Sequence, residues 1–184
     1  MPSFLEPIAI ILALLYVFWA ARGSLLCWPA AIISSAIYCY LCYEVKLYPE
    51  TLLQFFYLVF GIYGWMKWKT SSNSGTVTYR KILPKQLLIL LGSGLIITLP
   101  VAWFFDNYTD TALPWMDAPI MVFSLMATWM VAQKFLENWY FWILIDLAAA
   151  ALYEMRDMKL TALLYLFYVA MAVWGLKKWK EQTK

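Results

Sequence analysis

Two tryptophans and an aspartate share one face of an apolar helix near the end of the chain. On a helix that runs from Glu137 to Tyr153, residues Trp139, Trp142 and Asp146 fall at positions i, i+3 and i+7. A carboxylate flanked by apolar residues is costly to bury in a membrane, so it must face the protein interior or a water-filled cavity. Since an anion beside aromatic faces suits an organic cation, this face is a candidate binding site. The alternative is a buried hydrogen-bonding residue that holds helices together.

The composition places this face in a membrane protein. The 184 residues are 64% hydrophobic and 14% charged, with a mean hydropathy of +0.68, whereas soluble domains are about 25% charged. A net charge of +3 gives no case for nucleic acid binding. The chain has no histidine, and its three cysteines match no metal motif. We therefore expect no cofactor and no enzyme activity, since a membrane enzyme would need a nucleophile–base pair or a metal site.

Seven apolar segments are long enough to be spanning helices, which need about 20 mostly apolar residues. Their expected bounds are Phe4–Ala21, Trp28–Tyr43, Leu52–Trp68, Gln86–Phe104, Ala118–Phe135, Trp139–Tyr153 and Leu160–Trp179. The connections between them are mostly short, so consecutive helices should run antiparallel. The sequence thus predicts an all-α membrane protein with seven transmembrane helices.

The basic residues are divided unequally between the two sides of this bundle. The connections after the first, third and fifth segments, with the C-terminal tail, hold 11 Lys and Arg residues, and the other side holds 3, namely Lys46, Arg156 and Lys159. Because the basic side of a membrane protein is cytoplasmic, we expect the N-terminus outside and the C-terminus in the cytoplasm. The expected location is the bacterial inner membrane.

The chain also repeats itself at a constant offset of 111 residues. Trp28 aligns with Trp139 and Gly64 with Gly175, and the segment Leu52–Trp68 has 7 identities in 17 positions with its counterpart. A constant offset that pairs tryptophans and a glycine indicates two parallel three-helix repeats. We therefore divide the chain into a first repeat (4–68), a basic loop with a linker helix and an acidic loop (69–116), a second repeat (117–179) and a cytoplasmic tail (180–184).

The repeat predicts which further residues face a central site. Glu50, Gln54 and Tyr57 form a polar stripe whose counterparts include Tyr165 and Tyr168, with the same spacing. Substrates of parallel-repeat transporters bind between the repeats. The counterpart of Asp146 is Ser35, so the halves differ in chemistry at that level. The alternatives are core tyrosines, an amide that joins helices at Gln54 and a solvated loop charge at Glu50.

At these residues the chain resembles the PnuC family of vitamin transporters. The motifs that carry the resemblance span nearly the whole chain. They are Leu47–Gln54, Tyr63-Gly64-Trp65 with Trp68, Met116-Asp117-Ala118, Lys134 with Glu137-Asn138-Trp139 and Trp142, and Leu160–Tyr165.

The resemblance implies a SWEET-like 3+1+3 arrangement of the seven helices. It also implies uptake of an unphosphorylated vitamin by facilitated diffusion, trapping of that vitamin by a cytosolic kinase, and a homotrimer in the lipid bilayer. Carried over, the family's substrate residues are Gln54, Asn138, Trp139, Trp142, Asp146, Tyr165 and Tyr168; Ser35, Glu50 and Tyr57 are added from the repeat.

The family's substrates leave a choice between three vitamins. Nicotinamide riboside members often have Asn where this chain has Asp146 and Gly61. Thiamine and nicotinamide riboside are both aromatic cations, and the aminopyrimidine of thiamine can also donate to a carboxylate. We therefore expect thiamine, as in the PnuT-type relatives, with nicotinamide riboside as the alternative. Riboflavin is neutral, so it offers Asp146 no positive charge to pair with. A non-transporting substrate-capture protein is a further alternative.

Overall fold

Seven α-helices form the computed structural model, which describes residues 4–44, 48–72 and 79–183. Lys46, Leu47, residues 73–78 of the basic loop and Lys184 lie outside the described residues. No strand is present in the described ranges. The helices are α1 (Leu5–Ala21), α2 (Cys27–Glu44), α3 (Tyr48–Ser72), α4 (Pro84–Tyr108), α5 (Pro114–Ala132), α6 (Asn138–Met155) and α7 (Lys159–Gln182).

The helix bounds agree with the apolar segments in their centres and differ at their ends. Helices α3, α4 and α7 extend past their apolar segments by several residues, because hydropathy marks the part suited to lipid and not the end of the hydrogen-bonded backbone. Helix α5 is the exception, since it ends at Ala132 and not at Phe135. The cause is local: Lys134 has a φ of 58°, in the left-handed region, which turns the chain directly into α6.

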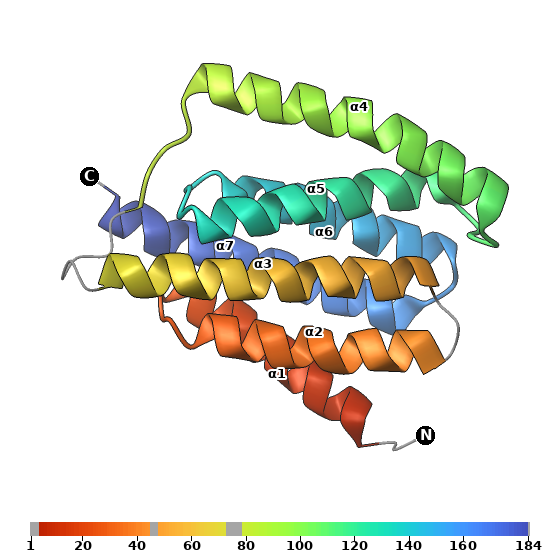
Figure 1. The fold of residues 1–184 in the computed structure, drawn as a ribbon, viewed down its shortest axis with the longest axis horizontal. Helices are drawn as coiled ribbons and strands as arrows, with labels where there is room; N and C mark the ends of the chain where they lie inside the picture. The colour runs from red at the N-terminus through yellow and green to blue at the C-terminus, as the bar shows by residue number, and fades with distance from the viewer. Residues whose placement is uncertain (1–3, 45–47, 73–78, 184) are drawn as a thin grey trace.

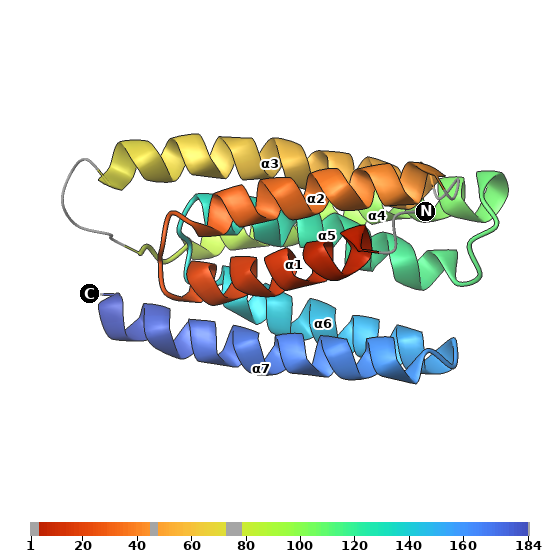
Figure 2. The ribbon, with the colours of Figure 1, turned by 90° about the horizontal axis from the view of Figure 1, so that it is seen from below.

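Consecutive helices run in opposite directions along one long axis, and the termini lie at opposite ends (Figures 1 and 2). Helices α1, α2 and α3 pack in order, and α5, α6 and α7 do the same. The two groups meet where α3 contacts α5 and where α1 contacts α7. Helix α4 packs chiefly against α5 and lies apart from the other helices (Figure 1).

The outside of this bundle is apolar. Large hydrophobic side chains are exposed on every helix, and on α4 they include Leu88 at 72% and Ile96 at 71%. By length and composition, three helices within the described ranges could each cross a membrane: α4, α5 and α7. Helix α1 is apolar and shorter, with 17 residues. Helices α2, α3 and α6 do not meet that standard, because they carry the polar and aromatic residues described below.

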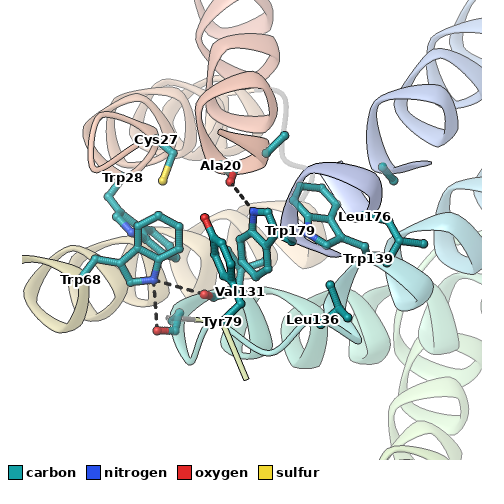
Figure 3. Close-up of a cluster of buried hydrophobic side chains, with 13 residues drawn as sticks. Ala20, Cys27, Trp28, Trp68, Tyr79, Val131, Leu136, Trp139, Leu176 and Trp179 are labelled. Atoms are coloured by element: carbon teal, nitrogen blue, oxygen red, sulfur yellow. Dashed lines mark hydrogen bonds between the residues drawn. The ribbon is translucent and has the colours of Figure 1, made fainter. Parts of the chain in front are cut away.

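Four buried tryptophans pack together at the end of the bundle that holds the C-terminus (Figure 3). This tryptophan cluster consists of Trp28, Trp68, Trp139 and Trp179. Trp28 meets Trp68 edge-on with ring centroids 5.4 Å apart and planes at 86°, and Trp139 meets Trp179 at 5.4 Å and 88°. Both contacts join the start of a second helix to the end of a third helix in the same half.

Two indole hydrogen bonds tie the halves together at this cluster. Nε1 of Trp179 donates to the carbonyl of Ala20 at 3.0 Å, and Nε1 of Trp68 donates to the carbonyl of Val131 at 3.2 Å, with Ala132 at the same distance (Figure 3). Ala20 and Val131 are 111 positions apart, as are Trp68 and Trp179. Each half therefore binds the end of the other half's first helix through an equivalent tryptophan.

Candidate functional site

A cavity of about 210 Å³ lies between the two halves of the bundle. It begins beside the tryptophan cluster and extends toward the middle of the helices. Residues from six of the seven helices line it: Ala13, Tyr16, Val17, Ala20, Trp28, Ala31, Ser34, Ser35, Gln54, Tyr57, Gly61, Thr128, Val131, Trp139, Trp142, Asp146, Tyr165, Tyr168 and Ala172. Helix α4 contributes no residue to this lining.

Most of the site residues named from the sequence meet at this cavity. Those that line it are Ser35, Gln54, Tyr57, Trp139, Trp142, Asp146, Tyr165 and Tyr168. Asn138 does not: it is fully buried at the first position of α6, where its Nδ2 donates to the carbonyl of Phe135 at 2.6 Å. Glu50 does not line it either, and lies exposed in the first turn of α3.

Asp146 is the one charged residue in the described lining. Its side chain is 5% exposed, near the middle of α6. No described residue donates a hydrogen bond to it or pairs with it in a salt bridge. Its charge lies within electrostatic range of the hydroxyl groups of Tyr57, Tyr165 and Tyr168. A buried carboxylate with no protein cation beside it can pair with a bound cation.

Aromatic rings surround the carboxylate on the same half of the cavity. Trp142 lies one turn from Asp146 on α6, and Tyr165 and Tyr168 come from α7 with ring centroids 6.0 Å apart. Tyr165 is held in place by Tyr153, whose ring stacks on it at 5.2 Å and 12°. A flat cationic ring bound here could therefore contact aromatic rings and a negative charge at the same time.

The lining follows the repeat closely. Sixteen of the lining residues form pairs 111 positions apart: Val17 with Thr128, Ala20 with Val131, Trp28 with Trp139, Ala31 with Trp142, Ser35 with Asp146, Gln54 with Tyr165, Tyr57 with Tyr168 and Gly61 with Ala172. Equivalent positions on the two halves thus face the same space.

Sequence reasoning missed the contribution of α1 and α5. Tyr16 and Val17 reach the cavity from α1, and Thr128 and Val131 reach it from α5. Trp28 was also missed, although its pairing with Trp139 in the repeat was a signal that could have identified it. The hydroxyl of Ser34 is already used within the protein, since its Oγ donates to the carbonyl of Ala9 at 2.9 Å.

Charged groups lie at both ends of the bundle, at helix ends or in the connections between helices. At one end an ion pair joins Arg156 to Asp117 at 2.5 Å, and the Arg156 guanidinium lies 5.8 Å from the ring of Tyr153. At the other end Tyr79 stacks on Trp179 at 4.1 Å, and burial raises the pKa of Tyr79 to about 12. Burial, with Arg80 nearby, lowers the pKa of Lys134, whose ammonium lies 5.1 Å from the ring of Trp68.

The described part of the chain contains no group of three His, Cys, Asp or Glu residues that could hold a metal ion. The chemistry of the cavity therefore rests on one carboxylate, hydroxyl and amide groups and aromatic faces. These groups can bind and orient a small molecule.

Comparisons with known proteins agree with this architecture. A family model described as nicotinamide mononucleotide transporter matches residues 3–181. The nicotinamide riboside transporter PnuC of Escherichia coli (strain K12) is 24% identical over 208 residues, covering 99% of this chain and 87% of that protein. The riboflavin/roseoflavin transporter RibM of Streptomyces davaonensis is 26% identical over 173 residues, covering 92% and 81%.

A solved structure is similar over almost the whole chain. The crystal structure of the vitamin B3 transporter PnuC matches with a TM-score of 0.79 at 22% identity, covering 98% of this chain and 82% of that one. At this identity the likeness shows a shared fold.

Proposed function

Since the chain belongs to the nicotinamide mononucleotide transporter family, we propose that it carries an unphosphorylated, cationic B vitamin across the membrane. The family and its relatives are vitamin transporters, so this chain is a transporter and not an enzyme. The observation that supports a cationic substrate is Asp146, a carboxylate that is 5% exposed and has no described cationic partner in the cavity. No Lys or Arg lines the cavity among the described residues, which disfavours a phosphate group there.

The mechanism that fits is alternating access between two parallel three-helix repeats in a SWEET-like 3+1+3 arrangement. Three observations support it: the constant offset of 111 residues, the reciprocal contacts of α1 with α7 and α3 with α5, and the eight matched pairs around the cavity. In this mechanism the halves rock around the bound vitamin, exposing it to one side and then the other. Transport then follows the gradient of the vitamin.

The direction of uptake follows from the distribution of charge. We place the end with the tryptophan cluster and the basic loops in the cytoplasm of a bacterial inner membrane, with the N-terminus outside. A cytosolic kinase would trap the delivered vitamin by adding a phosphate. We also propose a homotrimer, as implied by the family resemblance.

Thiamine is the substrate that makes the fullest use of the cavity. Its thiazolium ring is a cation that can lie against Trp142 and Tyr165, and its aminopyrimidine has N–H groups that can donate to Asp146. Riboflavin offers the carboxylate no charge. A donor for Asp146 on a ring separate from the cation is the reason to place thiamine first.

Nicotinamide riboside is the second candidate. The relatives named as nicotinamide riboside transporters favour it, and one of them spans 99% of this chain. Its pyridinium ring is also a flat cation, and its ribose carries hydroxyl groups for Ser35 and Gln54. Both candidates carry N–H donors for the carboxylate, and they differ in where these lie: on an aminopyrimidine separate from the cationic ring in thiamine, and on the carboxamide of the cationic ring itself in nicotinamide riboside.

Titration calorimetry with the purified protein tests the proposal directly. Thiamine, nicotinamide riboside and riboflavin are titrated separately. Uptake of whichever vitamin binds is then measured in liposomes that contain only this protein. Tight binding of thiamine alone supports the first candidate, and preference for nicotinamide riboside supports the second. Binding without uptake would make the chain a substrate-capture protein. Selective binding of riboflavin would contradict the cationic assignment.

A further inference from the structure

The two walls of the cavity differ most at three matched positions, and at each of them the second repeat carries the larger side chain. Ala31, Ser35 and Gln54 on α2 and α3 stand where α6 and α7 carry Trp142, Asp146 and Tyr165. At the other matched positions the pairs are identical or change little in size. At these three positions the aromatic and anionic groups therefore lie on α6 and α7, and the smaller or uncharged polar groups lie on α2 and α3.

The largest of these differences in volume is at Ala31. An indole at Trp142 is matched by a single methyl group, so the first-repeat wall presents a much smaller side chain to the cavity at this position. Ala31 and Ser35 are four residues apart on α2 and share a face. Gly61 also lines the cavity, but a Cβ placed on it would meet Cγ1 of Ile32 at 2.9 Å, so Gly61 serves the packing of α3 on α2.

Two polar groups of the first-repeat wall also line the cavity: the Ser35 hydroxyl, one turn from Ala31 on α2, and the Gln54 amide, further along α3. Neither the Ser35 hydroxyl nor the Gln54 amide makes a hydrogen bond with another described residue, and Ser35 is 7% exposed. Buried polar groups are normally hydrogen-bonded, so these groups are suited to a bound molecule. Because neither carries a charge, they match hydroxyl groups and not a second ionised group.

We propose that Ala31 sets the size of a subsite for the neutral, hydroxyl-bearing arm of the vitamin. This inference rests on the proposed function, since it orients the same cationic substrate in the same cavity. The cationic ring lies against Trp142, Asp146 and Tyr165, and the arm lies over Ala31 with a hydroxyl group on Ser35. The residue opposite Trp142 is therefore a specificity-determining position: a larger side chain there selects for substrates with a shorter arm.

The test separates the arm from the ring by using paired ligands. Thiamine is compared with its analogue that lacks the hydroxyethyl arm, and nicotinamide riboside is compared with 1-methylnicotinamide, which keeps the pyridinium cation. Affinities are measured by calorimetry for the wild type and for Ala31→Ser, Ala31→Val and Ala31→Leu. Ala36→Leu is the matched control, because Ala36 lies exposed on the same helix and does not line the cavity.

We expect Ala31→Leu to weaken binding of the arm-bearing ligand by tenfold or more and to change binding of its arm-less partner by less than threefold. The loss should grow from Ser to Val to Leu, so the smaller substitutions give the answer if Ala31→Leu does not fold. Ala36→Leu should change neither affinity. Equal losses for both members of a pair, or no loss for either, would overturn the subsite while leaving the cation site intact. Failure of the wild type to bind any of the four cations would instead overturn the proposed function, and the subsite with it.

Discussion

The tryptophan cluster and the cavity adjoin each other, yet the repeat is preserved in one and broken in the other. In the cluster the two edge-on indole contacts have the same 5.4 Å separation, and each half makes the same hydrogen bond to the other. In the cavity, matched positions hold Ser35 and Asp146, or Ala31 and Trp142. Equivalent residues therefore hold the halves together at one end, and unequal residues line the space between them.

The difference indicates that the cluster joins the two halves, whereas the cavity is suited to an asymmetric molecule. Under the proposed alternating access, equivalent contacts let each half take the same part in the motion. A small vitamin has no two-fold symmetry, so equivalent walls would bind it poorly. Substitutions that make the halves unequal in the cluster should lower stability, whereas substitutions that make them equal in the cavity should lower affinity.

Removing the charge of Asp146 should have the largest effect on binding. Asp146→Asn makes this position neutral like its counterpart Ser35, and a hydrogen bond to a charged group contributes about 1.5–3 kcal/mol. Affinity for the cationic vitamin should fall about tenfold to hundredfold in calorimetry, with little change in the unfolding temperature. Ser35→Ala is the matched control and should cost only a few-fold, since a neutral hydrogen bond contributes about 0.5–1.5 kcal/mol. Unchanged affinity in Asp146→Asn would contradict the electrostatic role.

A methyl group added beside Trp28 or beside Trp139 should destabilise the two halves by similar amounts. A Cβ on Gly64 would lie 2.3 Å from the ring of Trp28, and one on Gly175 would lie 2.6 Å from the ring of Trp139. Both rings are buried, so Gly64→Ala and Gly175→Ala should each cost about 1–3 kcal/mol through overpacking. Thermal unfolding in detergent would measure the loss.

Gly92 provides the control for this pair. A Cβ on Gly92, in α4, would meet nothing within 4 Å, so Gly92→Ala should leave stability unchanged or raise it slightly through helix propensity. A large loss at only one of Gly64 and Gly175 would show that the two halves are not equivalent at the cluster.

Removing the Trp142 ring should have a smaller effect on binding than removing the charge of Asp146. Trp142→Ala makes this position equal to Ala31 and removes a ring that can contact a cation, an interaction of about 0.5–2 kcal/mol. Calorimetry should show a loss of about threefold to thirtyfold for the cationic vitamin. Trp103→Ala is the control, since Trp103 is 54% exposed on α4, away from the cavity. An equal loss in both variants would assign the effect to general destabilisation.

The sequence predicts part of the cavity and of the helices that form it. The seven helices follow from hydropathy, and the repeat with helical spacing brings Gln54, Tyr57, Asp146 and Tyr168 to one cavity. Periodicity identifies polar residues on apolar helices well, because a polar side chain in an apolar segment has few other places to go.

Other parts of the site depend on contacts that spacing does not encode. Asn138 shares the start of a helix with Trp139, but its side chain turns back to the carbonyl of Phe135. Tyr16 and Thr128 have the sequence signature of ordinary packing residues, and their place in the lining depends on how α1 and α5 are arranged between the halves. The end of α5 depends on the left-handed conformation of Lys134, which a non-glycine residue rarely adopts.

The smallest predicted effect concerns the two indole hydrogen bonds that link the halves. Trp68→Phe removes the bond to Val131 and Ala132, and Trp179→Phe removes the bond to Ala20, while both keep an aromatic ring. Each should cost about 0.5–1.5 kcal/mol of stability, the usual range for one buried hydrogen bond.

The two costs should be similar because the bonds are equivalent under the repeat, and vitamin affinity should stay close to that of the wild type because neither indole lines the cavity. Trp65→Phe is the control, since Trp65 lies on α3 near Trp68 and is 40% exposed. Thermal unfolding and calorimetry on the same samples would separate the two readouts. A loss of affinity without a loss of stability would place these indoles in substrate recognition, and would end the distinction between a symmetric cluster and an asymmetric cavity.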